Sequence, residues 1–216
     1  MSSNQIASIR KEYLLHRLDE KSMLKNPFSQ FNKWWEEVMN STIDEPNTMT
    51  LSTSYKNKPS SRIVLLKEYD KNGFTFFTNY QSKKATEIAT NPFASLLFFW
   101  KELQRQVRIE GKLEKVSEKK SDEYFKSRPL ESKIGAWVSP QSKKIKDRQI
   151  IEIGVEKWKK KILNENTSII RPDFWGGYIL KPKYFEFWQG RESRLHDRVV
   201  YKKLRNNTWN IYRIAP

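Results

Sequence analysis

The sequence predicts a mainly β protein with flanking helices, of the α+β class, built on an antiparallel barrel of six or seven strands. Short strand-like runs follow one another through mostly short, hairpin-like connections, and helical patterns stand between and around them. The chain also holds 8 Trp, 9 Tyr and 12 Phe in 216 residues, enough apolar rings to fill a core. Closing the sheet would remove exposed strand edges, so a barrel is favoured over an open sheet.

The N-terminal part predicts two helices and then a meander of strands. Residues 10–19 form a polar arm with a helical pattern, and Asn26-Pro27 supplies an N-cap and a proline at the first position of a second helix. Its apolar residues recur at helical spacing: Phe28, Phe31, Trp35 and Val38. Strand patterns cover residues 49–55, 60–68 and 74–78, and an Asn72-Gly73 turn precedes the last of them.

The remaining elements alternate in the same way. A helix over residues 83–90 ends at Asn91-Pro92, and strands are predicted over residues 94–100 and 106–116. The strand over residues 106–116 alternates apolar with charged residues, which predicts one buried face and one solvent-exposed face. Helical patterns cover 117–126 and 147–163, and the last strands cover 178–188, 199–204 and 208–214. We therefore expect one domain over residues 21–216, preceded by an arm over residues 1–20.

Composition excludes several classes of site. The chain has no Cys and only two His, so thiolate chemistry and histidine-rich metal sites are excluded, and no metal is expected. No G-x-G-x-x-G or G-x-x-x-x-G-K pattern occurs. The N-terminus lacks an apolar signal region and no stretch approaches the length of a membrane span, so a cytoplasmic protein without membrane partners is expected.

The net charge of +16 is compatible with nucleic-acid binding, but its distribution argues against it. Residues 143–161 hold eight bases and three acids on a segment whose apolar residues indicate a helix. Such a lysine-rich face is typically a solvated surface.

Two phosphate-sized anion sites are indicated by four groups of residues. Arg62 and Lys67 bracket an apolar strand, and Lys83-Lys84 follow Ser82 at a helix start, where free N–H groups favour a phosphate. Tyr124, Arg128 and Ser132 are spaced by four, either along a helix that continues past Pro129 or in a turn that presents all three. The fourth group is the amide and hydroxyl of Gln141-Ser142.

The densest group of chemically capable side chains lies near the C-terminus, between two aromatic-rich strands. It combines guanidinium groups, an imidazole and an indole, which suits a flat, anionic ligand. Its members are Trp188, Gln189, Arg191, Arg194, His196, Asp197 and Arg198.

Five blocks of the chain, in the same order, resemble the pyridoxamine 5′-phosphate oxidase family. They are the runs over residues 62–67, 77–84, 106–111, 127–142 and 185–198, and Arg213-x-Ala-Pro216 resembles the family's ending. The resemblance runs from about Arg10 to Pro216. The block over residues 185–198 is the most specific, because a fourteen-residue pattern of aromatic, arginine and histidine residues rarely recurs by chance.

The resemblance implies an FMN-binding split barrel that works as a homodimer with FMN at the subunit interface. It implies oxidation of pyridoxine 5′-phosphate or pyridoxamine 5′-phosphate to pyridoxal 5′-phosphate, the final step of vitamin B6 cofactor synthesis and salvage. A hydride equivalent would pass from C4′ to FMN and then to O₂, giving H₂O₂. FMN and substrate together account for the two anion sites.

The resemblance also implies site residues. For FMN they are Arg62, Ile63, Val64, Leu65, Leu66, Lys67, Phe77, Thr78, Lys83, Lys84, Gln106, Gln141, Ser142, Trp188 and Arg198. For the substrate they are Lys67, Tyr124, Arg128, Ser132, Arg194, Leu195, His196 and, as lid contacts from the arm, Arg10 and Tyr13. Arg194 and His196 are the candidate catalytic residues: Arg194 orients the substrate, and His196 binds a ring substituent, exchanges a proton, or simply caps its loop.

The chain departs from the family at two positions. Lys83 stands where Arg is more frequent, which exchanges a forked donor for a point charge, and Arg191 stands where small residues are common. Two other classes stay open: a flavin-binding split barrel without oxidase activity, and a nucleic-acid-binding barrel, which would be colourless.

Overall fold

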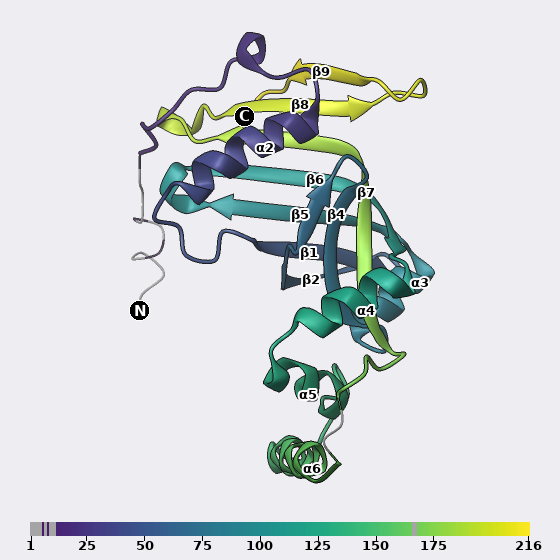
Figure 1. Cartoon of the computed structure of the whole chain (residues 1–216). Coiled ribbons are helices and arrows are strands. Elements are labelled where there is room, and N and C mark those ends of the chain that lie inside the picture. Colours follow the sequence, from purple (N-terminus) through teal and green to yellow (C-terminus); the bar gives the residue numbers. More distant parts are fainter. Residues whose placement is uncertain (1–5, 7, 9–11, 166–167) are drawn as a thin grey trace. The chain divides into compact units, whose positions relative to one another are not determined.

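The computed structural model describes Ile6, Ser8, residues 12–165 and residues 168–216. In this part of the chain nine strands form one sheet, seven of them in the order β2-β1-β5-β6-β7-β4-β3, with β8 pairing with β7 and β9. The pairs β3–β4, β4–β7, β7–β8 and β8–β9 are antiparallel. The predicted α+β class is confirmed, with nine described strands where six or seven were expected (Figure 1).

The elements lie close to their predicted positions. The strands are β1 (Thr48–Tyr55), β2 (Lys58–Leu65), β3 (Glu68–Asp70), β4 (Gly73–Asn79), β5 (Phe93–Trp100), β6 (Arg105–Lys115), β7 (Trp175–Gln189), β8 (Asp197–Lys203) and β9 (Trp209–Arg213). The helices are η1 (Glu20–Ser22), α2 (Pro27–Met39), α3 (Lys83–Thr90), η2 (Lys101–Leu103), α4 (Glu118–Ser127), α5 (Leu130–Val138), α6 (Gln149–Glu165) and η3 (Glu192–Arg194).

The chain divides into two compact units. Unit 1 comprises Met1–Thr50, Leu96–Glu110 and Pro182–Pro216, and unit 2 comprises Leu51–Ser95 and Gly111–Lys181. The expectation of a single domain over residues 21–216 stays a prediction, and each unit is described by itself below.

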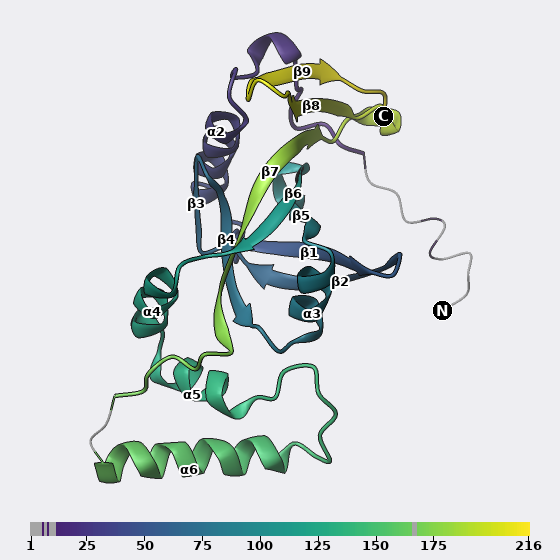
Figure 2. The same cartoon turned by 90° about the vertical axis from the view of Figure 1, so that its right-hand side faces the viewer.

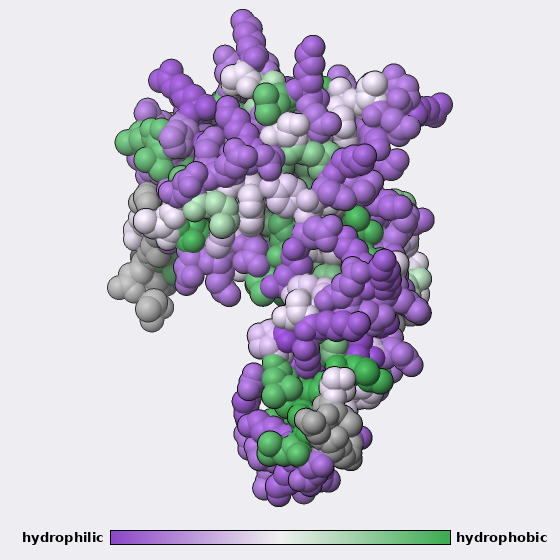
Figure 3. Space-filling model, in the orientation of Figure 1, coloured by the Kyte–Doolittle hydropathy of each residue, from purple (hydrophilic) through white to green (hydrophobic). Residues whose placement is uncertain are grey.

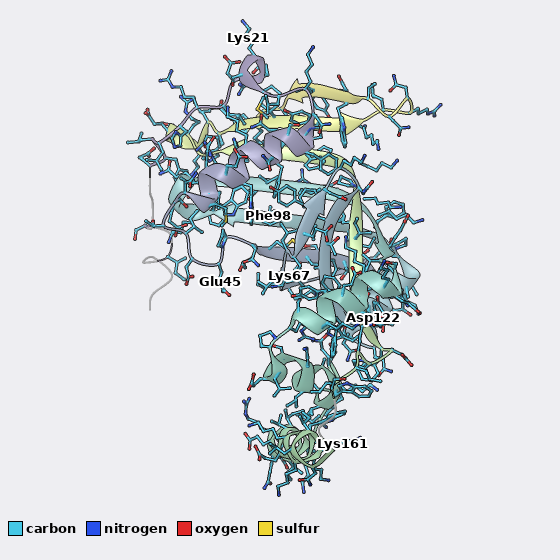
Figure 4. The ribbon with its side chains drawn as sticks, in the orientation of Figure 1. Lys21, Glu45, Lys67, Phe98, Asp122 and Lys161 are labelled. Carbon is cyan, nitrogen blue, oxygen red and sulfur yellow. The ribbon has the colours of Figure 1, made fainter. Side chains whose placement is uncertain are left out.

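Helix α2 closes the core of unit 1. Asn26 caps it as predicted, since its side chain accepts a hydrogen bond from the Phe28 N–H at 2.8 Å. Its aromatic face packs on the sheet: the Phe31 ring lies 5.4 Å from Phe98, which is labelled in Figure 4, and Trp34 lies 5.1 Å from Phe187. Burying each such ring contributes about 2 kcal/mol, so this face holds the helix in place.

The arm before α2 differs from its prediction. Residues 12–19 contain no helix, while Arg10 and Lys11 lie outside the described residues. The backbone is bound by side chains instead, with the Leu15 N–H donating to Gln104 Oε1 at 3.3 Å and the Leu18 N–H to Asp197 Oδ2 at 3.0 Å. These contacts replace intrahelical hydrogen bonds, so helical periodicity was a poor guide here.

In unit 2 the predicted Asn72-Gly73 turn joins β3 to β4. Asp70 Oδ1 accepts from the Asn72 N–H at 2.8 Å and from the Gly73 N–H at 3.2 Å. Gly73 has φ of +150°, and a Cβ there would lie 2.1 Å from the Leu180 carbonyl oxygen. Only glycine therefore allows β4 to begin this close to β7.

The segment around Pro129 resolves an alternative that the sequence left open. Helix α4, capped by Ser117, ends at Ser127, and Arg128 is extended with φ of −70° and ψ of 148°. Proline disfavours helical backbone in the residue before it, so the chain turns and α5 begins at Leu130. The turn interpretation is confirmed, and α5 itself was not predicted.

Helices α5 and α6 lie side by side in both views of the chain (Figure 2), where the rings of Trp137 and Trp158 are 5.3 Å apart. All lysines of α6 are exposed, as predicted for a solvated face. Figure 3 shows hydrophobic side chains among hydrophilic ones over these helices, whose exposed apolar residues are Leu130, Ile150, Ile153 and Leu163. Among the described residues, no helix has the length and apolarity needed to cross a membrane.

Candidate functional site

A cavity of about 960 Å³ lies in unit 2, between the ends of β2 and β4, the start of α3 and the α4–α5 turn. Its lining contains five cations, which are Arg62, Lys67, Lys83, Lys84 and Arg128, and no carboxylate. Charges of one sign around a concave site raise the local potential for the opposite sign. The cavity is therefore suited to a ligand with one or two phosphate groups.

Arg62 in β2 is oriented by a buried carboxylate. Its Nη2 lies 3.0 Å from Glu87 Oε2, and its Nη1 donates to the Leu51 carbonyl at 3.2 Å. Glu87 also accepts from the hydroxyls of Thr53 and Ser60. Burial alone would raise the pKa of Glu87, but these hydrogen bonds and the Arg62 charge outweigh it and hold the pKa below its ordinary value. The guanidinium is thus fixed at the cavity before any anion binds.

Lys84 is the most buried cation of the cavity. Its Nζ lies 3.0 Å from Gln141 Oε1, 3.1 Å from Thr78 Oγ1 and 3.3 Å from Ser82 Oγ, all of them neutral groups. Burial, and then the charge of Arg62, lower the pKa of Lys84 to about 8. An anion placed beside it would stabilise the charged form and raise the pKa again.

Arg128 lies over an aromatic wall of the cavity. Its guanidinium carbon lies 4.5 Å from the centroid of the Trp175 ring, and burial lowers its pKa. Tyr124 stacks on Phe77 with centroids 3.9 Å apart, and Phe77 lies parallel to Trp175 at 5.6 Å. Nη1 of Arg128 is buried and, within the described part of the chain, has no hydrogen-bond partner. A buried donor without a partner in the protein is available to an acceptor atom that enters the cavity.

Most other residues predicted for unit 2 also reach the cavity. Lys83 is exposed and lies 3.6 Å from Glu87, and Lys67, labelled in Figure 4, follows the end of β2. The remaining lining residues among the predicted ones are Ile63, Val64, Leu65, Phe77, Thr78, Tyr124, Ser132, Gln141 and Ser142. Leu66 is buried and does not line the cavity, because its side chain points into the core.

The predicted residues near the C-terminus gather separately, in unit 1. The rings of Trp188 and His196 are 4.6 Å apart, and Tyr13 packs edge-on against Trp188 at 5.9 Å and lies 5.9 Å from His196. Between them, Ser193 and Arg194 both adopt left-handed backbone, with φ of 51° and 62°. Such conformations cost about 1 kcal/mol or more in residues other than glycine and are frequent at functional sites.

The remaining unit 1 candidates occupy different surroundings. Arg198 Nε donates to Glu186 Oε1 at 2.8 Å, and its Nη1 donates to the Ala215 carbonyl at 3.0 Å. Gln106 is half-buried in β6, and Leu195 is exposed after η3. Arg10 lies outside the described residues.

Two acidic residues with structural roles at the site, Glu87 and Glu186, were not singled out from the sequence. Glu87 holds Arg62; Glu186, 2% exposed, accepts from both Arg108 and Arg198. Asp197, which the sequence places in the C-terminal group, accepts from Arg191 at 3.0 Å, from Arg213 at 2.7 Å and from the Leu18 N–H at 3.0 Å. For Glu186 a signal existed, since a charge between two phenylalanines of a strand must find a buried partner.

Known proteins resemble this chain over nearly its whole length. Residues 35–162 match the family described as pyridoxamine 5′-phosphate oxidase, and residues 175–216 match a pyridoxine 5′-phosphate oxidase C-terminal dimerisation region. A pyridoxine/pyridoxamine 5′-phosphate oxidase of Trichormus variabilis is 50% identical over 212 residues, covering 98% of each chain. The enzyme of the same name from Cupriavidus taiwanensis is 47% identical over 213 residues, covering 98% of this chain and 99% of the relative.

Solved structures show the same fold. The crystal structure of PhzG from Burkholderia lata, in complex with tetrahydrophenazine-1-carboxylic acid, superposes with a TM-score of 0.86 at 24% identity, covering 95% of this chain and all of that one. A pyridoxamine 5′-phosphate oxidase-related, FMN-binding protein from Nostoc punctiforme gives a TM-score of 0.69 at 18% identity, covering 90% of this chain and all of that one. The predicted split-barrel fold class is confirmed.

Proposed function

The chain belongs to the pyridoxamine 5′-phosphate oxidase family, and on that premise we propose that it oxidises pyridoxine or pyridoxamine 5′-phosphate to pyridoxal 5′-phosphate with FMN. O₂ would be reduced to H₂O₂, and the reaction would complete vitamin B6 cofactor synthesis and salvage. The observation that carries the proposal is the cavity lined by five cations and no carboxylate, with an aromatic wall of stacked rings. It suits two phosphorylated, planar ligands.

The residues present fit FMN. Arg62, Lys83 and Lys84 are grouped where β2 meets the start of α3, and they would neutralise the FMN phosphate through charge-assisted hydrogen bonds. The neutral partners of Lys84 leave its charge free for that phosphate. Phe77, Thr78, Gln141, Ser142 and the strand backbone over residues 63–66 would contact the rest of the cofactor.

The substrate phosphate is assigned to Lys67, Tyr124, Arg128 and Ser132, which line the same cavity. Arg128 supports this assignment most strongly, because its buried Nη1 lacks a partner within the described chain. A phosphate oxygen would supply that partner. The ring of the substrate would then lie towards the cofactor.

The reaction needs position and electrostatics from the protein. A bound FMN would supply the redox chemistry, since a flavin can take up a hydride equivalent from C4′ of the substrate and pass the two electrons on to O₂. Arg194 would orient the substrate ring, Leu195 and His196 would contact it, and Tyr13, with Arg10, would cover it from the arm. Holding the reacting groups in one geometry lowers the entropic part of the activation barrier.

We further propose that a homodimer completes the site. Trp188, Arg194, His196 and Arg198 all lie within the stretch that matches a C-terminal dimerisation region, whereas the cavity lining belongs wholly to unit 2. FMN would therefore lie at the subunit interface, with Gln106, Trp188 and Arg198 contributed by the partner subunit.

The decisive experiment combines a spectrum with an assay. Purified protein should be yellow, and with pyridoxine 5′-phosphate and O₂ it should form the aldehyde and H₂O₂. Arg194→Ala should lower turnover while the protein stays yellow, whereas Arg62→Ala should chiefly lose flavin. A flavin-loaded protein that makes no pyridoxal 5′-phosphate would contradict the oxidase proposal, and a colourless protein that binds nucleic acid would support the charge-based alternative.

A further inference from the structure

The environment of His196 is asymmetric. Its Nδ1 lies 3.1 Å from the backbone nitrogen of Arg191, whose N–H points at it. The rings of Trp188 and Tyr13 pack against the imidazole in tilted orientations, with centroids 4.6 Å and 5.9 Å away. Nε2 makes no hydrogen bond to any described residue. One nitrogen is thus engaged by the protein's own backbone, and the other is available to a ligand.

This asymmetry determines where the proton resides. A nitrogen that accepts an N–H hydrogen bond carries no proton, so a neutral His196 must carry its proton on Nε2. Protonating Nδ1 as well would bring two N–H groups face to face. Burial and the neighbouring Arg194 charge also lower the pKa of His196, and Asp197, the nearby carboxylate that opposes them, is already bound by Arg191 and Arg213. The neutral form with Nε2–H is therefore favoured.

The loop has the conformation that this contact requires. After Arg191, the left-handed residues Ser193 and Arg194 turn the chain back on itself. The Ser193 N–H is held by Glu12 Oε2 at 3.2 Å, and the Leu195 N–H donates to the Glu192 carbonyl at 3.0 Å. Several contacts therefore fix the turn that holds residue 191 against the imidazole, and the hydrogen bond to Nδ1 is part of that turn.

We propose that the Arg191 backbone holds His196 as a neutral Nε2–H donor, so that His196 gives a hydrogen bond to an acceptor atom of the substrate and removes no proton from it. The inference rests on the proposed oxidase function and assigns one role among those open to this residue. Arg191 acts through its backbone as a positioning residue, and its side chain is not required for that role. The proton acceptor of the reaction then lies elsewhere.

The protonation state can be measured without turnover, because the chain has only two histidines. Flavin-loaded protein labelled with ¹⁵N-histidine should show, in a long-range ¹H–¹⁵N spectrum at pH 7, one ring with bare Nδ1 and protonated Nε2. A His16→Gln variant assigns that ring to His196, and Arg191→Ala, which keeps the backbone N–H, should leave the pattern unchanged. A ring of His196 protonated on Nδ1, or doubly protonated at pH 7, overturns the proposal.

Two substitutions then separate donor from base. The amide nitrogen of Gln reaches the position of Nε2, whereas that of Asn lies near the position of Nδ1, facing the Arg191 N–H. His196→Gln should keep kcat/KM within about tenfold of the original, and His196→Asn should lose about 100-fold, since a lost hydrogen bond to a charged acceptor costs up to about 3 kcal/mol. Equal, large losses in both variants would indicate a base and overturn the donor role. If the unsubstituted protein itself makes no pyridoxal 5′-phosphate, the proposed function fails while the NMR result still stands.

Discussion

Arg128 carries a charge that the protein only partly compensates. Its guanidinium faces Trp175 and Phe125, and its buried Nη1 has no acceptor in the described structure. We therefore expect Arg128→Met to raise the KM for pyridoxine 5′-phosphate by about 10- to 100-fold, the equivalent of about 1.5–3 kcal/mol for a charged hydrogen bond. Steady-state kinetics would measure this, with kcat and the flavin spectrum largely retained.

The matched control for that variant is Lys126→Met. Lys126 is an exposed lysine of α4 two residues before Arg128, outside the cavity lining. Its loss should leave KM within about twofold, because exposed charges are screened by solvent. Similar effects of both substitutions would assign the change to general electrostatics and contradict a specific phosphate contact.

The lowered pKa of Lys84 predicts that cofactor binding depends on pH. Its pKa, lowered to about 8, means that the free protein loses this charge as the pH rises through 8, whereas a bound phosphate would hold the proton. The dissociation constant of FMN should therefore rise above pH 8, by up to about tenfold per pH unit for one coupled proton. Fluorescence titration at pH 7 to 9.5 would measure it.

Riboflavin supplies the control for the same experiment, since it has the ring of FMN and no phosphate. Its binding should vary little between pH 7 and 9.5, and Lys84→Met should remove most of the dependence seen with FMN. A dependence that persists unchanged in Lys84→Met would have to come from another group, and the assignment of Lys84 would be wrong.

Helix α3 is tied to the sheet of unit 2 by the buried carboxylate of Glu87. Glu87→Ala removes the partner of the Arg62 guanidinium and of two hydroxyls, so we expect the free energy of unfolding to fall by about 3 kcal/mol. Because the folded pKa lies below its ordinary value of 4.5, this contribution is complete above pH 4.5 and is lost as the pH falls through the folded pKa.

Urea unfolding of both proteins at pH 7 and at pH 3 measures this contribution. The difference between Glu87→Ala and the original protein should shrink at the lower pH. Glu156→Ala, on the exposed surface of α6, should change stability by about 0.5 kcal/mol or less at either pH. A similar small effect at Glu87 would mean that α3 is held by its apolar contacts alone.

Elements with strong local signals were the ones that could be predicted. Asn26-Pro27, Ser82 and Asn72-Gly73 act through their own backbone neighbours, so the boundaries of α2, α3 and β4 followed closely from the sequence. The arm over residues 12–19 was mispredicted because its backbone binds side chains far along the chain. Helix α5 was missed because the sequence around Pro129 predicts either a continuation of α4 or a turn, and neither alternative includes a new helix that begins at Leu130.

For the site, the residues of the cavity were predictable because their motifs are contiguous and cationic. Their carboxylate partners were not, since Glu87 and Glu186 act through contacts between distant segments. The asymmetry of His196 required the turn at Ser193 and Arg194, and left-handed backbone in such residues has no sequence signal. The sequence thus indicated the candidate anion-binding groups, and the structure added their orientation.

At the scale of the whole molecule, the homodimer proposal predicts complementation between defective chains. Arg128→Met alters the cavity of unit 2, and Arg194→Ala alters the loop of unit 1. If each site combines unit 2 of one subunit with unit 1 of its partner, a mixed dimer holds one intact site and one site with both defects. Random pairing makes half of the dimers mixed, so about one quarter of the original activity should return at low substrate concentration.

The two variants, carrying different affinity tags, would be coexpressed and the mixed dimer isolated by sequential purification. Each variant alone should have low kcat/KM while retaining flavin, and the isolated mixed dimer should reach about half of the original value, since one site of two is intact. A mixed dimer no more active than its parents would show that each site is made within a single chain. Light scattering of the same samples establishes that the species assayed is a dimer. Low activity of the mixed sample can then not result from dissociation into monomers.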